Sequence, residues 1–134
     1  MIELTSCYND RNFQTVKIGI TQYSASPSYI DGPSLIQRVS ELGLCGVEPF
    51  FAVADDVLFS WSANDMRRFL VEAEKLSIAV PSTAVGIFNC DSSLVENSSK
   101  NKAVDLIERA LDFTATVNAD VMLLCTYLSS EPNT

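Results

Sequence analysis

Short apolar runs and longer amphipathic stretches alternate along this chain. The short runs are rich in β-branched and aromatic residues, which favour strands, and they cover Val16–Tyr23, Gly46–Phe50, Ile78–Thr83 and Val121–Tyr127. Their starts lie roughly 30, 32 and 43 residues apart, close to the length of a strand–helix module. The pattern therefore predicts four parallel strands joined by helical crossovers.

The stretches between the runs repeat apolar residues at helical spacing, and each has one apolar face. Typical start and stop residues mark their ends: Asp31, Pro33 and Gly43 for the first, Ser62 and Asp65 for the second, Ser98 or Ser99 and Asn118 for the third. Right-handed crossovers place successive helices on one side of an advancing sheet. We therefore predict an α/β fold in which parallel (βα) units form the first half of a TIM barrel, with four strands and three main helices. Residues 1–15 are a polar extension, residues 16–134 form the half barrel, and we expect the rest of the barrel outside this sequence.

Composition narrows the class of protein. With 134 residues and 47% hydrophobic content, the chain is long enough for one domain with a core. The net charge of -8 disfavours nucleic acid as a partner. We expect a cytoplasmic protein, because there is no membrane-spanning apolar stretch and no secretion signal at the start. The four cysteines form no Cys-x-x-Cys pair, which predicts reduced thiols rather than a disulfide framework.

Two prolines suggest where the mouth of the barrel lies. Pro49 and Pro81 lack the N–H that an interior strand needs, so we expect them where the second and third strands leave the sheet at their carboxyl ends. In TIM barrels the loops at that end build the active site. Glu48, Ser82 and Thr83 are therefore candidate substrate-binding residues, and Glu48 is the best of them. Its alternative role is that of a framework carboxylate bonded to a neighbouring group.

Two further positions are candidates by the same reasoning. Tyr23 or Gln22 could line the pocket from the first strand, and a one-residue change of register exchanges them, so both stay open. Thr126 ends the fourth strand as Ser82 and Thr83 end the third. Hydroxyl groups at these positions suit the recognition of a sugar, although small polar residues after a strand also serve as ordinary turn residues.

Residues that could perform catalysis are scarce. The chain contains no histidine, so Cys125 has no base to activate it and is interpreted as a buried thiol. Asp55 and Asp56 are adjacent carboxylates, but adjacent side chains diverge and no further ligand has the required spacing. We predict no catalytic residue and no metal ligand in this chain.

The order of several short segments resembles the xylose isomerase-like TIM barrels, the superfamily of sugar phosphate isomerases and epimerases. The similarity covers about residues 16–128, and its matching segments are Lys17–Ser24, Glu41–Glu48, Asp65–Val80 and Val117–Val121. The resemblance implies a divalent metal such as Mn, Mg, Co or Zn, held by carboxylates and a histidine, and two glutamates that move protons between adjacent carbons of a sugar. Those groups belong to strands five to eight of the family, so none of them corresponds to a position here.

This reading predicts the amino-terminal fragment of a metal-dependent sugar or sugar-phosphate isomerase or epimerase, inactive alone, which supplies barrel wall on the substrate side. A second hypothesis is a half-barrel assembly module that needs a partner, because four strands of typical size leave an apolar face on the order of 320 Å² uncovered and favour self-association or a missing second half. A third is a small flavodoxin-like ligand-binding domain, which would have helices on both faces of its sheet.

Overall fold

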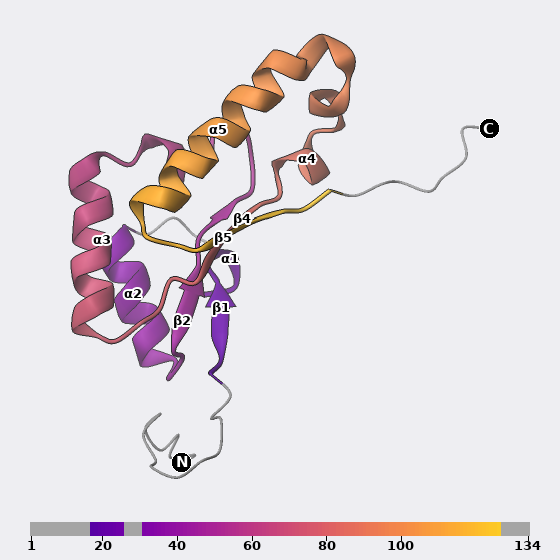
Figure 1. Cartoon of the computed structure of the whole chain (residues 1–134). Helices are drawn as coiled ribbons and strands as arrows, with labels where there is room; N and C mark the ends of the chain where they lie inside the picture. The colour runs from indigo at the N-terminus through magenta and orange to yellow at the C-terminus, as the bar shows by residue number, and fades with distance from the viewer. Residues whose placement is uncertain (1–16, 26–30, 127–134) are drawn as a thin grey trace.

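The strands of this protein run parallel to one another and follow chain order across the sheet (Figure 1). A computed structural model describes residues 17–25 and 31–126. One ladder joins β1 (Gly19–Thr21) to β2 (Gly46–Glu48), and the other joins β3 (Phe50–Phe51), β4 (Ser82–Val85) and β5 (Val121–Leu124) in that order. Two backbone hydrogen bonds link the ladders: the N–H of Val47 donates to the carbonyl of Ala79, and the N–H of Ala84 donates to the carbonyl of Pro49, both at 2.9 Å. The two ladders therefore form one continuous surface.

The expectation that the prolines mark the carboxyl ends of the second and third strands is wrong for Pro81 and holds in part for Pro49, which directly follows β2. Pro49 is buried between β2 and β3, and the second strand run continues beyond it through Phe51. Pro81 directly precedes β4, which extends to Val85 instead of ending at Thr83 as the apolar run suggested. The second strand run therefore ends one residue later than its apolar pattern indicated, at Phe51 instead of Phe50, and the third ends two residues later, at Val85 instead of Thr83.

A bulge explains how the sheet accepts both prolines. The pairing advances by four residues on one strand, from Gly46 to Phe50, and by five on its neighbour, from Ala79 to Ala84. The extra residue lies beside Pro81, where the regular exchange of hydrogen bonds between the two strands is interrupted. A proline lacks an N–H, and a bulge removes the need for one, so both residues fit inside the sheet.

Three long helices connect the strands, α2 (Gly32–Glu41), α3 (Ala63–Lys75) and α5 (Lys100–Thr116). The shorter elements are α1 (Gln22–Ala25), α4 (Ile87–Cys90) and the 3-10 helices η1 (Val57–Ser60), η2 (Ser92–Val95) and η3 (Asn97–Ser99). The expected capping box is present, since the Ser62 hydroxyl accepts from the N–H of Asp65 and the carboxylate of Asp65 accepts from the N–H of Ser62. Gly43 and Asn118 follow α2 and α5 with φ of 72° and 55°, the left-handed conformation that ends a helix. Ser99 precedes α5 but makes no side-chain cap hydrogen bond.

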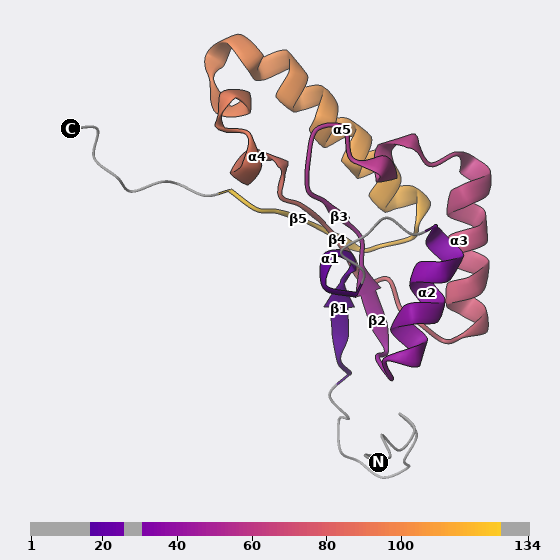
Figure 2. The ribbon, with the colours of Figure 1, turned by 180° about the vertical axis from the view of Figure 1, so that it is seen from behind.

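The three long helices share one hydrophobic core with one face of the sheet (Figures 1 and 2). Buried residues of this core come from the strands and from all three helices, among them Val47, Phe51 and Val85; Leu35, Ile36 and Val39; Phe69; Ala110 and Phe113. This is the singly wound arrangement of a partial TIM barrel, and the predicted fold class is confirmed. The two-sided arrangement of the flavodoxin-like alternative is not found in the described part of the chain. We call the sheet face opposite the helices the open face.

Candidate functional site

The open face of the sheet carries a polar pair, Glu48 and Ser82. Successive side chains of a strand point to opposite faces, and Val47 and Thr83 are buried on the helix side. Glu48 and Ser82 therefore point to the open face, where both are half-buried. The hydroxyl of Ser82 donates to Oε2 of Glu48 at 2.5 Å, a short charge-assisted hydrogen bond. Two of the predicted substrate-binding residues are thus in direct contact.

A hollow of about 240 Å³ surrounds this pair. It is lined by residues of the first three strand runs: Gly19, Ile20, Thr21, Gly46, Val47, Glu48, Pro81 and Ser82. Three of these positions are glycine or threonine, so the hollow has little side-chain bulk on its β1 side. Because the lining consists of residues of β1 and β2 with Pro81 and Ser82, the hollow lies over the sheet and not at the tips of the loops.

A second set of polar contacts lies where β1 passes into α1. Oε1 of Gln22 accepts from the N–H of Phe50 at 3.3 Å, which ties α1 to the second strand run just after Pro49. The hydroxyls of Thr21 and Ser24 lie 3.2 Å apart. The sequence could not decide whether Gln22 or Tyr23 lines the pocket, and both residues belong to α1. The side chain of Tyr23 lies outside what the structure describes. The contribution of Thr21 to the hollow was missed, because the apolar run extends to Tyr23 whereas β1 ends at Thr21.

The other two candidates do not join the pair. Thr83 is fully buried on the helix side, and its hydroxyl lies 2.6 Å from that of Thr114 on α5. Its expected position at the mouth is therefore wrong, because the third strand runs two residues further than its apolar pattern. Thr126 is exposed just beyond β5, after Cys125, whose N–H donates to the carbonyl of Val85 at 2.9 Å.

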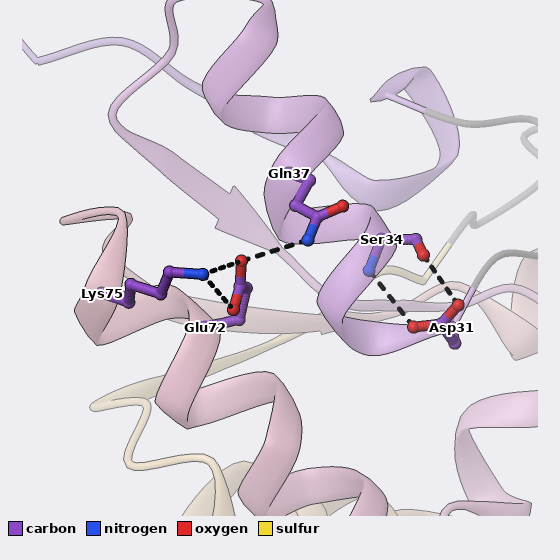
Figure 3. Close-up of polar contacts among 5 residues, drawn as sticks. All are labelled: Asp31, Ser34, Gln37, Glu72 and Lys75. Carbon is purple, nitrogen blue, oxygen red and sulfur yellow. Dashed lines mark hydrogen bonds and ion pairs between the residues drawn. The ribbon is translucent and has the colours of Figure 1, made fainter.

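Two carboxylates with a lowered pKa, Asp31 at the start of α2 and Glu72 on α3, do not line this hollow. Figure 3 shows their polar contacts. The Ser34 hydroxyl donates to Asp31 at 2.7 Å and lowers the pKa of that carboxyl. The pKa of Glu72 is lowered chiefly by the amide of Gln37, 3.2 Å away on α2, and also by Lys75. Glu72 therefore connects α3 to α2, and its contacts hold these two helices together.

A divalent metal finds no ligand set in the described residues. No three His, Cys, Asp or Glu side chains come together within residues 17–25 and 31–126, and Glu48 is the one carboxylate that lines the hollow. The metal that the family resemblance implies therefore does not fit the groups present, and we derive no step through it. In the same part of the chain, no helix combines the length and the apolar character that crossing a membrane requires.

One of three comparisons with known proteins bears on the fold. No protein-family model matches the chain, and no curated protein matches it in sequence. Among solved structures, the chain is similar to a D-psicose 3-epimerase in the presence of D-fructose, with a TM-score of 0.64 and 20% sequence identity. The match covers 89% of this chain and 42% of that chain, so this chain spans less than half the length of the epimerase. The expected likeness to xylose isomerase-like TIM barrels is confirmed at the level of the fold.

Proposed function

We propose that this chain forms the substrate-side wall of a sugar isomerase or epimerase and that Glu48 and Ser82 bind sugar hydroxyl groups. The observation that carries the proposal is their 2.5 Å hydrogen bond in a hollow on the open face of a partial barrel. The fold likeness to a D-psicose 3-epimerase supports a sugar or sugar phosphate as the substrate class. In this proposal the protein acts in carbohydrate metabolism.

The chemistry of the pair suits hydroxyl recognition. An ionised carboxylate has about four acceptor positions, and Ser82 occupies one of those of Glu48. The remaining positions can accept protons from the hydroxyls of a sugar, while the oxygen of Ser82 can accept a further hydrogen bond. Since Ser82 fixes the orientation of the carboxylate before the ligand arrives, little conformational entropy is lost on binding.

In the proposed role, Glu48 binds and orients substrate and does not transfer protons. The metal and the proton-transfer groups of a complete barrel would come from outside the described residues, because no ligand cluster is present among them. Tyr23 and Thr126 remain proposed substrate contacts in addition to the pair. We do not extend the proposal to Thr83, which is buried beneath α5.

Saturation-transfer NMR with D-fructose or D-psicose tests the proposal on the chain itself. We expect saturation transfer to the sugar protons, and we expect Glu48→Gln to lower the affinity by roughly tenfold or more, because it removes a charged acceptor. Glu41→Gln is the matched control, since Glu41 is an exposed carboxylate on α2. Equal transfer for the wild type and Glu48→Gln would refute the role of Glu48. In a completed barrel, Glu48→Gln should lower kcat/KM more than it lowers Tm, and the reverse would identify a framework residue.

A half-barrel assembly module is the second candidate function. The observation that favours it is the exposure of Val121 and Leu123, which lie on the open face of β5 and alternate with the half-buried Met122. Apolar side chains exposed side by side on a sheet face favour association with a partner. Sedimentation at micromolar concentration tests this function, and a well-folded cooperative monomer would contradict it.

A further inference from the structure

A half-buried aromatic ring, that of Phe50, shares the open face of the sheet with Glu48 but does not line the hollow. Val47, Pro49 and Phe51 are fully buried, and the ring of Phe51 lies 5.1 Å from that of a phenylalanine on α5. The side chains that alternate with them, Glu48 and Phe50, therefore point away from the helices. Residues two apart in a strand are separated by about 6.6 Å, so one ligand the size of a hexose can contact both side chains.

Gly86, the residue after β4, leaves room for the ring of Phe50. A Cβ added at Gly86 would lie 2.5 Å from Cζ of Phe50, so the tip of the ring occupies the space that a side chain would take. Gly86 has a φ of -106°, a negative value that other residues also adopt, so its backbone conformation does not require glycine. The missing side chain therefore allows the Phe50 ring to extend along the open face to the carboxyl end of β4.

Hydrogen bonds fix the backbone at both ends of this contact. The N–H of Phe50 donates to Oε1 of Gln22 at 3.3 Å, and the N–H of Gly86 donates to the carbonyl of Phe51 at 2.9 Å. Strands β3 and β4 run side by side, with Phe50 paired to Ala84 (Figure 2). The ring is thus positioned before a ligand arrives, which limits the conformational entropy lost on binding.

We infer that Phe50 is a specificity-determining residue that contacts the C–H groups of a sugar in its ring form, while Glu48 binds the hydroxyl groups. The face of an aromatic ring is electron-rich, and it attracts the weakly positive hydrogens of C–H groups. A closed sugar ring presents several C–H groups on one rigid face, whereas an open-chain polyol does not. The inference rests on the proposed sugar site and adds to it the form of the sugar that is bound.

Two ligands test the contact on the full chain. Methyl D-fructopyranoside is locked in the ring form, whereas D-sorbitol has the carbon chain of a hexose and cannot close a ring. With carbon-13-labelled phenylalanine, we expect the ring signals of Phe50 in the NMR spectrum to shift on addition of methyl D-fructopyranoside and to stay in place with D-sorbitol. Shifts of equal size with both ligands, or no shift with either, would overturn the inference.

Phe50→Leu measures the energetic effect, because it keeps an apolar side chain and removes the aromatic ring. By saturation-transfer NMR we expect its Kd for methyl D-fructopyranoside to rise about threefold to tenfold and its Kd for D-sorbitol to stay unchanged. Phe59→Leu is the matched control. Phe59 is also a half-buried aromatic residue, but it lies in the helix layer, where the guanidinium of Arg109 is 4.5 Å from the centre of its ring.

The variants separate this inference from the proposed function. An equal rise of Kd in both leucine variants, or an equal rise for both ligands in Phe50→Leu, would overturn the role of Phe50. If circular dichroism showed that Phe50→Leu does not fold, the ring signals of the wild type would decide alone. Weaker binding in Glu48→Gln with unchanged binding in Phe50→Leu would overturn this inference and leave the proposed sugar site intact, whereas absence of binding by either ligand would overturn both.

Discussion

The hydroxyl pair beneath α5 gives the sharpest test of how β4 is positioned. Thr114 has one hydroxyl proton, and it donates that proton to the carbonyl of Ala110 at 2.7 Å. Thr83 must therefore be the donor in its 2.6 Å contact with Thr114. The direction of this relay makes the two threonines unequal, because each substitution leaves a different group without its partner.

Valine at either position keeps the shape and removes a hydroxyl. Thr114→Val leaves the buried proton of Thr83 without an acceptor, so we expect the free energy of unfolding to fall by about 2 kcal/mol. Thr83→Val leaves Thr114 bonded to Ala110, and we expect a loss of about 1 kcal/mol. The double variant removes both polar groups, so its loss should be about 1 kcal/mol and not the sum.

Urea unfolding followed by the fluorescence of Trp61, the only tryptophan, measures the three losses. A larger loss for Thr83→Val than for Thr114→Val would refute the donor assignment. Additive losses in the double variant would show that the hydroxyls do not interact. If Thr83→Val instead weakened sugar binding without lowering stability, the residue would return to the site that the sequence suggested.

Three further outcomes follow from the structure. Hydrogen bonds from Ser34 and Ser62 lower the pKa of Asp31 and Asp65 in the folded chain. The stability that these hydrogen bonds add is therefore complete above the unfolded pKa and is lost as the pH falls below about 4. A series of urea unfolding curves from pH 7 to pH 3 should show this loss of stability, and the double variant Asp31→Asn/Asp65→Asn should show a smaller loss. Gly32→Ala places a methyl group 2.8 Å from Cβ of Phe69, which should lower the free energy of unfolding by about 1–3 kcal/mol, and an unchanged urea midpoint would contradict the packing. Titration calorimetry of the chain with Mn²⁺ or Co²⁺ should show no tight binding and assays should show no isomerase activity, and a stoichiometric submicromolar site would refute the first expectation.

The repeating elements of the fold follow from local sequence. Four apolar runs and three amphipathic stretches determine the parallel strands and long helices, because strand and helix periodicities are properties of neighbouring residues. The capping box of Ser62 and Asp65 and the left-handed Asn118 also act within a few residues. These features were therefore predictable, as was the burial of the helix layer on one side of the sheet.

Register and side-chain partners were decided by the tertiary structure. The sequence placed Glu48, Ser82 and Thr83 together at a strand exit, whereas the bulge beside Pro81 puts Ser82 on the open face with Glu48 and Thr83 beneath α5. One extra residue in a strand changes which face the following side chains reach, and nothing local in the sequence signals it. The sequence alone thus determined the set of candidate polar residues. Contacts between segments 34 residues apart decided that Glu48 and Ser82 form the pair, because a bulge depends on the neighbouring strand as much as on its own.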